Sequence, residues 1–511
     1  MKNRALILDF GSQYTQLIAR RIREIGVYTE IVPFSIATER IREFSPGALV
    51  LSGGPSSVYT RNAPLIDAKI LDLGIPILGI CYGMQLIAHL SGMRVTPAKE
   101  REFGLSRLNL SSRSRLLNRI SSPMTVWMSH GDKIAQLPPD FEITGTTENT
   151  EIAVIESDAR RLYGVQFHPE VAHTTEGRRV LENFLFNISG LKADWNMGNF
   201  IADTIARVRR TVKNGRVILG LSGGVDSTVL AVLLKRAVGE QLIPVFVDTG
   251  LLRKNEFSDL MSRFRDQLKL DVHGIDASEL FLERLRQVRS PERKRKIIGK
   301  TFIDVFASIE KDVGPADFFA QGTLYPDVIE SVSVNGPAAK IKSHHNVGGL
   351  PKTLKWQLIE PLRELFKDEV RLIGRELGLD ETWLRRHPFP GPGLAVRIIG
   401  AVNRERVRRL QEADAILIEE LHNRNIYDDI WQAFAVLLPI RSVGVMGDVR
   451  TYENVAVLRM VRSVDGMTAD SYPAEHAFLS ATADRIVNEV KGINRVAYDL
   501  TSKPPGTIEW E

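Results

Sequence analysis

The fold is decided where Ile75-Pro76-Ile77-Leu78-Gly79-Ile80 leads into Cys81-Tyr82-Gly83 and then Met84-Gln85-Leu86-Ile87-Ala88. The apolar run before the turn predicts a buried strand, and the run after it predicts a helix. Cys81 is the only cysteine among the 511 residues, and a glycine stands two positions away on each side. A sharp turn from strand to helix exposes a nucleophile, so Cys81 is the first candidate catalytic residue.

Further strands and helices alternate around this turn. Residues 5–8, 48–51 and 162–166 are predicted strands, and residues 15–25 and 177–188 are predicted helices. This alternation predicts an α/β fold with a parallel sheet, whose ligands gather beyond the carboxyl ends of the strands. The turn Ser52-Gly53-Gly54-Pro55 and Cys81 both occupy such ends. A break in the pattern at 190–195 sets the end of this first domain, 3–194.

A second alternating series follows the break. Helices at 200–212 and 227–238 and strands at 216–220 and 242–247 are predicted. They form a second parallel α/β domain, 195–386, in which the basic stretch 289–300 is interpreted as a solvated helical face. The Pro/Gly-rich segment 387–393 marks the next boundary. Beyond it, helices at 404–424 and 477–490 with strands at 431–438 and 455–464 predict a small α+β domain, 387–511.

Composition limits the class of protein. Lys and Arg number 67 and Asp and Glu number 62, a formal net charge of +5 that is small for this length and gives no indication of nucleic-acid binding. One cysteine excludes an internal disulfide framework and suits a reducing compartment, so we expect a cytoplasmic protein. The first apolar run, 5–8, is too short for a signal peptide and no run approaches a membrane span, so we expect no membrane partner.

A catalytic cysteine needs a base and an electropositive environment. His168, in Phe167-His168-Pro169-Glu170, is the candidate base, and Glu170 is the group that orients its imidazole. The helix after Tyr82 directs its positive end at the sulfur. Gly54, which has no side chain to block close approach, and the backbone amide of Tyr82 are the candidate oxyanion donors. The histidines expected to be structural are His89, His130 and His173.

Each of these motifs is weak by itself, because a single buried cysteine is more often a small hydrophobic residue. Together, Gly-Gly-Pro, Gly-Ile-Cys-Tyr-Gly and His-Pro-Glu stand in the order and spacing of the class I glutamine amidotransferases, which residues 3–194 closely resemble. The resemblance implies that Cys81 attacks the side-chain amide of glutamine, forms a glutamyl thioester and releases ammonia.

A second site is predicted where Ser222-Gly223-Gly224-Val225-Asp226-Ser227-Thr228 follows a predicted strand and opens a helix. Two glycines let the backbone fold around an anion, and the helix start supplies N–H groups and a dipole, so phosphate is the expected ligand. The loop lacks the spacing of a Walker A motif. Asp226, a carboxylate within an anion-binding turn, is the candidate ligand for a Mg²⁺ ion that bridges the phosphates.

The Ser-Gly-Gly-x-Asp-Ser pattern resembles the fingerprint of the ATP pyrophosphatases, which share the adenine nucleotide alpha-hydrolase-like fold. These enzymes split ATP between the α- and β-phosphates and adenylate an oxygen of a second substrate. In that family the position of Asp248, at the end of the next strand, contacts the nucleotide. An ammonia source followed by an oxygen activator on one chain implies an amidating enzyme.

The third segment extends the resemblance to the whole chain. With 341–349, 386–394 and 441–448, the final run Lys503-Pro504-Pro505-Gly506-Thr507-Ile508-Glu509-Trp510-Glu511 resembles the glutamine-hydrolysing GMP synthetases. This family converts xanthosine 5′-phosphate (XMP), ATP and glutamine to GMP, AMP, pyrophosphate and glutamate through an adenylated XMP. The resemblance implies XMP contacts from Arg295, Lys503 and Glu509, ATP contacts from Lys367 and Asp368, and a homodimer formed through the C-terminal domain.

Three alternatives remain open. NAD synthetase also couples glutamine hydrolysis to adenylation, but its nitrilase-like glutaminase lacks these cysteine and histidine motifs. A tRNA-thiolating enzyme shares the pyrophosphate loop, but sulfur transfer needs further cysteines to carry persulfide, and this chain has one. A non-catalytic protein that senses glutamine and nucleotides would keep the same residues, and only activity separates it from an enzyme.

Overall fold

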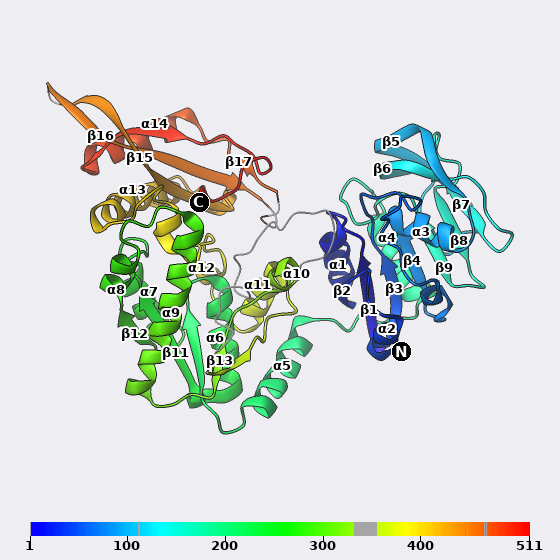
Figure 1. Ribbon diagram of the computed structural model, residues 1–511, viewed down its shortest axis with the longest axis horizontal. Coiled ribbons are helices and arrows are strands. Elements are labelled where there is room, and N and C mark those ends of the chain that lie inside the picture. Colours follow the sequence, from blue (N-terminus) through cyan, green and yellow to red (C-terminus); the bar gives the residue numbers. More distant parts are fainter. Residues whose placement is uncertain (1, 111–112, 332–354, 447, 464–465, 467) are drawn as a thin grey trace. The chain divides into compact units, whose positions relative to one another are not determined.

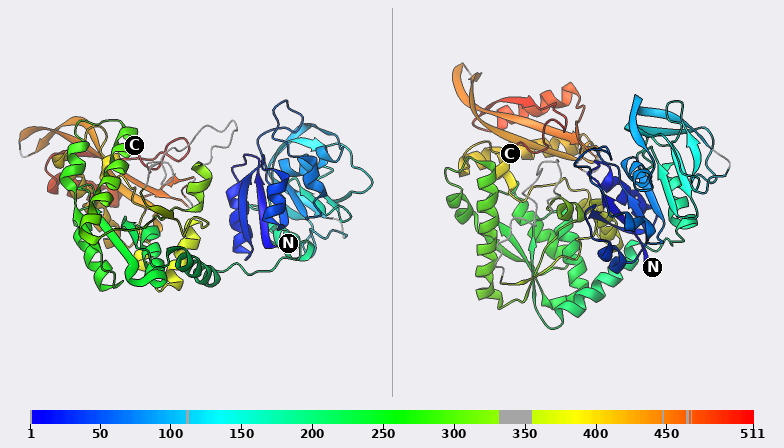
Figure 2. Two further views of the ribbon diagram at one scale, coloured as in Figure 1. Left: turned by 60° about the horizontal axis from the view of Figure 1, so that its bottom comes forward. Right: turned by 45° about the vertical axis from the view of Figure 1, so that its right-hand side comes forward.

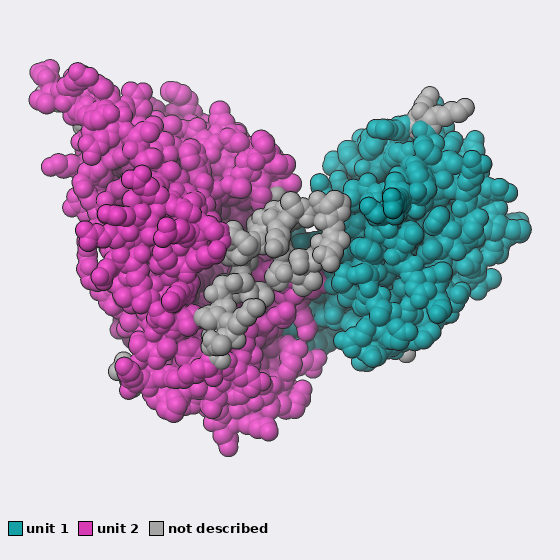
Figure 3. Space-filling model, in the orientation of Figure 1, with its two compact units in different colours: residues 1–200, 333–341 teal, residues 201–332, 342–511 magenta. Residues whose placement is uncertain are grey.

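The computed structural model describes residues 2–110, 113–331, 355–446, 448–463, 466 and 468–511. Within this range the chain forms two units, one ending at Phe200 and the other beginning at Ile201 (Figures 1 and 3). The first unit corresponds to the predicted amidotransferase region. The second holds the other α/β sheet together with the C-terminal sheet. The segment 341–349, which the sequence places in the family resemblance, lies outside the described residues.

The first unit is built on one nine-stranded sheet in the order β2-β1-β3-β4-β9-β8-β7-β5-β6. Its strands are β1 Lys2–Asp9, β2 Tyr28–Pro33, β3 Pro46–Leu51, β4 Ile77–Ile80, β5 Val95–Leu110, β6 Met124–Ile134, β7 Glu142–Thr146, β8 Val154–Ser157 and β9 Leu162–Val165. Its helices are α1 Thr15–Glu24, α2 Thr38–Phe44, α3 Tyr82–Leu90 and α4 Gly177–Glu182, with a 3-10 turn at Ala68–Asp72 and a π-helical turn at Asn183–Ile188.

The centre of this sheet is parallel, because β2, β1, β3, β4 and β9 run in one direction. Every residue of β3, β4 and β9 is buried, as expected for strands covered on both faces. From β9 onward the pairing is antiparallel and ends in the long β5–β6 hairpin. The parallel α/β core was predicted from sequence and is confirmed, whereas the hairpin was not predicted.

The second unit contains a five-stranded sheet in the order β12-β11-β10-β13-β14, all parallel. Helices flank this sheet on both sides (Figure 2). Its strands are β10 Val217–Leu221, β11 Leu242–Asp248, β12 His273–Asp276, β13 Phe318–Ala320 and β14 Gln357–Ile359. Helix α5 Met197–Val212 begins in the last residues of the first unit and continues into the second. The other helices of the second unit's α/β part are α6 Val225–Val238, α7 Glu256–Asp266, α8 Ser278–Arg284, α9 Pro291–Val313, α10 Tyr325–Ser331, α11 Lys367–Glu376 and α12 Glu381–Leu384, with a 3-10 turn at Gly239–Gln241.

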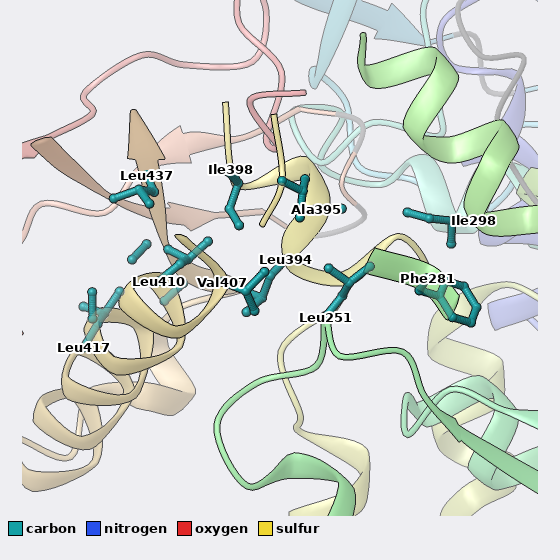
Figure 4. Close-up of a cluster of buried hydrophobic side chains, with 14 of the residues drawn as sticks. Leu251, Phe281, Ile298, Leu394, Ala395, Ile398, Val407, Leu410, Leu417 and Leu437 are labelled. Carbon is teal, nitrogen blue, oxygen red and sulfur yellow. The ribbon is translucent and has the colours of Figure 1, made fainter. Parts of the chain in front are cut away.

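The same unit continues into a smaller, mostly antiparallel sheet. Its elements are β15 Gln432–Met446, β16 Val449–Arg462, β17 Asp470–Ser471 and β18 Ile493–Tyr498, with helices α13 Arg404–Asn423 and α14 His476–Glu489 and 3-10 turns at Gly393–Val396 and Tyr427–Asp429. One hydrophobic cluster joins both sheets of the unit: Figure 4 shows Phe281 and Ile298 together with Leu394, Leu410 and Leu437. The predicted order of two α/β regions and a small α+β region is confirmed.

The bounds of several elements differ from the sequence prediction. Helix α6 begins at Val225 instead of 227, because Gly224 takes an extended conformation at the N-cap and lets the helix start directly behind it. Strands β15 and β16 form a hairpin longer than the predicted strands. Among the residues that the structure describes, no helix is long and apolar enough to cross a membrane.

Candidate active sites

Cys81 lies on a strained turn between β4 and α3. Its φ of 51° is in the left-handed region, which a residue with a side chain rarely adopts. Both neighbouring glycines are required by packing. A side-chain carbon at Gly79 would lie 2.5 Å from the backbone of Gly83, and one at Gly83 would lie 2.2 Å from the carbonyl oxygen of Leu51. The sequence therefore forces this turn and places the thiol at the carboxyl end of β4.

His168 and Glu170 form a buried pair at this turn. Nδ1 of His168 lies 2.7 Å from Oε1 of Glu170, and the two residues are 3% and 1% exposed. Burial alone would lower the pKa of His168, but the Glu170 carboxylate and an interaction with Cys81 outweigh it and raise this pKa to about 10. At neutral pH the imidazole is therefore protonated, a state that stabilises a neighbouring thiolate.

The two predicted oxyanion residues, Gly54 and Tyr82, lie next to each other, and Gly53, which precedes Gly54, lies beside His168. A side-chain carbon at Gly53 would be 3.2 Å from Cε1 of His168, and one at Gly54 would be 2.8 Å from the carbonyl oxygen of Phe10 and 3.4 Å from the Tyr82 ring. Tyr82 is the first residue of α3, a position whose N–H precedes the intrahelical bonds. Its hydroxyl donates to the carbonyl of Pro64 at 2.9 Å, so its side chain is structural.

Two glutamines and a carbonyl that the sequence did not single out complete the environment of the sulfur. Nε2 of Gln166 and the carbonyl oxygen of Ser129 each lie 3.6 Å from Sγ of Cys81. Gln85, one turn into α3, lies 3.2 Å from Gln166. Both glutamines are uncharged, so no pattern of charged residues in the sequence indicates them. The one sequence signal for Gln85 is its position four residues after Cys81, which places it on the same side of the helix.

The three histidines expected to be structural have positions and partners of their own, outside the His168–Glu170 pair. His130 is buried, which lowers its pKa, and its Nδ1 lies 2.9 Å from the carbonyl oxygen of Asp132. His173 stacks on Trp127 with ring centroids 4.7 Å apart. His89 lies in the last turn of α3.

The pyrophosphate loop connects β10 to α6 as predicted. Gly223 has a φ of +72°, and a side-chain carbon there would lie 2.4 Å from Leu260. The Ser222 N–H donates to Oγ of Ser227 at 3.2 Å, and Oγ1 of Thr228 donates to the Gly224 carbonyl at 2.8 Å. The side chains of Ser227 and Thr228 thus hold the turn in place. The backbone N–H groups of the first turn of α6 remain available to bind an anion. Val225 is buried at the start of α6.

Asp226 and Lys367 meet across this loop. Nζ of Lys367 lies 2.8 Å from Oδ2 of Asp226, whereas Oδ1 is buried without a hydrogen-bond partner among the described residues. Lys367 and Asp368 are the first two residues of α11, and the ion pair with Asp226 places Lys367 at the loop. Across the described residues no group of three or more His, Cys, Asp and Glu side chains is arranged to hold a metal ion.

Asp248 ends β11 at the same edge of the sheet as the loop, since Leu221 pairs with Phe246. Burial, together with the charge of Asp276, raises the pKa of Asp248. Its carboxylate accepts from the Gly250 N–H at 2.8 Å and lines a pocket of about 270 Å³. Arg386, missed from sequence, donates to the Gly223 carbonyl at 2.8 Å and to Glu256, another residue of that pocket, at 2.6 Å.

The three residues predicted to contact XMP lie around the C-terminal segment. Glu509 accepts two hydrogen bonds, at 2.9 and 3.1 Å, from the buried guanidinium of Arg397 and a third, at 2.7 Å, from Gln432. Arg295 donates to the main-chain oxygen of Glu511. Nζ of Lys503 donates to the Gly466 carbonyl at 2.7 Å. Arg295 and Glu509 thus both help to hold the C-terminal segment in place. No sequence pattern indicated that Arg397 and Gln432 would contact Glu509.

Comparison with known proteins matches three sequence families in chain order. The class-I glutamine amidotransferase family matches residues 6–188, the NAD synthase family matches 197–294 and the GMP synthase C-terminal domain family matches 419–510. A solved structure of a putative GMP synthase subunit from Thermoplasma acidophilum is 34% identical, with a TM-score of 0.34, and the match covers 37% of this chain and 95% of that one. The fold and sites define a class-I glutamine amidotransferase joined to an ATP pyrophosphatase of the PP-loop type.

Relatives of full length decide the family. A glutamine-hydrolysing GMP synthase of Brachyspira hyodysenteriae is 54% identical over 100% of this chain and 99% of its own, and one of Chlorobium phaeobacteroides is 57% identical over 99% of both. The chain belongs to the family of glutamine-hydrolysing GMP synthases, enzymes that make GMP with glutamine as the nitrogen donor. The NAD synthase family covers only the ATP-binding segment, so it does not support the NAD synthetase alternative.

Proposed function

We propose that this chain aminates XMP at C2 in two sites, one that releases ammonia from glutamine and one that activates XMP with ATP. The observation that carries the proposal is the meeting of Cys81 with the His168–Glu170 pair at a strained turn, in a chain of the GMP synthase family. The test supplies the purified protein with XMP, ATP and glutamine. GMP, AMP, pyrophosphate and glutamate are the expected products, and absence of GMP would favour the non-catalytic alternative.

In the first site, the Cys81 thiolate attacks the side-chain carbonyl carbon of glutamine. The backbone amides at Gly54 and Tyr82 stabilise the oxyanion, and His168 gives its proton to the nitrogen that leaves as ammonia. The glutamyl thioester is then hydrolysed by a water molecule that His168 deprotonates. Glu170 holds the ring through Nδ1, which leaves Nε2 for these proton transfers.

Glu170→Gln should narrow the pH range of glutamine hydrolysis. In the unmodified protein the raised pKa keeps His168 protonated until the pH passes about 10, where activity falls. Without the carboxylate, burial lowers this pKa, so the alkaline limit moves to lower pH and activity at neutral pH drops by at least about tenfold. A pH profile of glutamate release measures both effects. An alkaline limit that stays in place would contradict the role of Glu170.

In the second site, the pyrophosphate loop binds the phosphates of ATP, and Lys367 neutralises part of their charge. The residues fit Mg²⁺, since Oδ1 of Asp226 is a buried carboxylate oxygen without a hydrogen-bond partner in the described part of the chain. Bound there, Mg²⁺ would screen the negative charge of the phosphates. Asp248 and Asp368 contribute further contacts to the nucleotide, on the evidence of their positions at the sheet edge and at the start of α11.

For XMP we propose contacts from Arg295, Lys503 and Glu509. The C2 oxygen attacks the α-phosphorus of ATP, pyrophosphate leaves, and ammonia then displaces AMP from C2. Arg397 and Gln432 fix the Glu509 carboxylate, which retains acceptor capacity for a hydroxyl or N–H of the nucleotide. The domain boundaries at 194 and 386 and the cytoplasmic location, favoured by the single cysteine, stay predictions.

We also propose a homodimer formed through the β15–β16 hairpin. Five large apolar side chains on this hairpin are 45–74% exposed: Ile440, Val443, Val445, Val449 and Tyr452. The distal part of the hairpin extends beyond the body of its unit (Figure 1). Val443 pairs with Tyr452 and Val445 with Arg450, so Val443, Val445 and Tyr452 share one face of the hairpin and Val449 lies on the opposite face. Exposed apolar side chains gathered on one element are typical of a protein interface, and a second copy of the same hairpin matches them in chemistry.

Val445→Glu combined with Val449→Glu should separate this dimer. Two buried carboxylates without partners oppose association strongly, so the sedimenting mass should fall from that of two chains to that of one. Leu65→Glu, which also places a carboxylate at an exposed apolar position, is the matched control and should leave the mass unchanged. A single-chain mass for the unmodified protein would contradict the proposal.

A further inference from the structure

Gln166 lies directly against the nucleophile, at the end of β9. The Cys81 N–H donates to the carbonyl of Val165 at 2.8 Å, so the backbone of the nucleophile is bonded to the residue that precedes Gln166. Gln166 is fully buried, and its own N–H donates to the carbonyl of Ala153 at 2.8 Å. Gln166 and His168, two residues apart just beyond β9, each interact with the side chain of Cys81.

The hydrogen-bond network fixes which end of the Gln166 amide faces the sulfur. Nε2 of Gln85 lies 3.2 Å from the Asp132 carbonyl oxygen, which can only accept, and 3.2 Å from Oε1 of Gln166. Both hydrogens of Gln85 are thereby used, and Gln166 must present its oxygen to Gln85. The NH₂ group of Gln166 is left toward Sγ of Cys81, at 3.6 Å.

The sulfur needs such a donor. The carbonyl oxygen of Ser129, 3.6 Å from Sγ, can only accept a hydrogen bond and therefore favours the protonated thiol over the thiolate. A donor in contact with the charged form has the opposite effect. Gln166 supplies a donor that carries no charge and does not titrate, in addition to the imidazolium of His168.

We propose that Gln166 is a further catalytic residue of the glutaminase site: it donates an amide hydrogen to the Cys81 thiolate, with Gln85 as the residue that sets its orientation. The inference rests on the proposed role of Cys81 as nucleophile. It gives the site two donors on the sulfur, His168 and Gln166, of which only His168 moves protons. Loss of Gln166 therefore reduces the thiolate population and leaves the acid–base step to His168.

The test uses the single cysteine of the chain. Cys81 is the only thiol that iodoacetamide can alkylate, and the rate of its alkylation against pH, followed by mass spectrometry, reports the thiolate. Gln166→Met should shift the pH of half-maximal rate upward by about one unit, the size expected for losing a hydrogen bond to a charged group. Glutamine-dependent turnover at neutral pH should fall about tenfold, while amination from ammonium salts is unchanged.

Two further variants keep the proposal falsifiable. Gln166→Glu keeps the shape and the acceptor for Gln85 but adds a negative charge, so its shift should exceed that of Gln166→Met. Asn183→Leu removes another buried carboxamide of the same unit, which bonds the carbonyls of Leu116 and Asn118, and should lower thermal stability without shifting the profile. An unshifted profile in both Gln166 variants would overturn the proposal. Cys81→Ala, assayed in parallel, reports separately on the proposed nucleophile.

Discussion

Cys81→Ala should lower glutamine-dependent GMP formation by at least about 10⁴-fold, because removal of a nucleophile leaves only substrate binding and the oxyanion donors to act. Amination from free ammonium salts should continue at the rate of the unmodified protein. The second site lies in another unit of the chain, which retains its ATP-binding loop and C-terminal segment. The measurement is GMP formation with each nitrogen source in turn.

The ammonium-dependent rate is the internal control of this experiment, because it requires a folded second unit. Loss of both activities would count against two separate sites. Retention of glutamine-dependent turnover would remove Cys81 from the mechanism. Alanine fits the site, because its methyl group is smaller than the thiol side chain that it replaces. The positive φ at this position disfavours every residue other than glycine, and so disfavours cysteine and alanine alike.

Asp226→Asn should lower the rate at which AMP and pyrophosphate form, with either nitrogen source, by about 10²-fold or more. The amide keeps the shape of the carboxylate but loses the charge that pairs with Lys367 at 2.8 Å and that would hold Mg²⁺ through Oδ1. Pyrophosphate release from ATP in the presence of XMP is the measured quantity. Glutamine hydrolysis should show whether the first unit remains intact.

Asp259→Asn is the matched control for this variant. Asp259 is exposed and lies in the first turn of α7, as Asp226 lies in the first turn of α6, so it carries a similar helix-dipole interaction without the loop. It should leave pyrophosphate release unchanged. If Asp226→Asn also left the release unchanged, the carboxylate would have no part in ATP cleavage.

Much of the first unit could be predicted because local signals and packing agree there. The apolar run before Cys81 predicts a buried strand, and the glycines on either side of Cys81 permit the tight turn into the helix that the structure shows. The β5–β6 hairpin was missed because its inward positions include Glu102 and His130, which are buried with hydrogen-bond partners. Polar residues that satisfy each other inside a sheet do not produce an apolar alternation.

The second unit shows the limit of reasoning from residue type. Arg397 is fully buried against Glu509 and Phe434, whereas an arginine is expected at the surface by default. Lys294, which is also fully buried, donates to the carbonyls of Ala395 and Ile398. These contacts join residues far apart in the chain, and no local pattern indicates them. Gln85 and Gln166 escaped notice for a different reason, since neutral amides have no distinctive spacing.

The central claim is that ATP activates the C2 oxygen of XMP as an AMP ester, which ammonia then displaces. The most direct measurement supplies XMP labelled with ¹⁸O at C2, together with ATP and glutamine, and follows the label by mass spectrometry. The account predicts one ¹⁸O atom in AMP for every GMP formed. Label in orthophosphate or in water, or ADP in place of AMP, would contradict it.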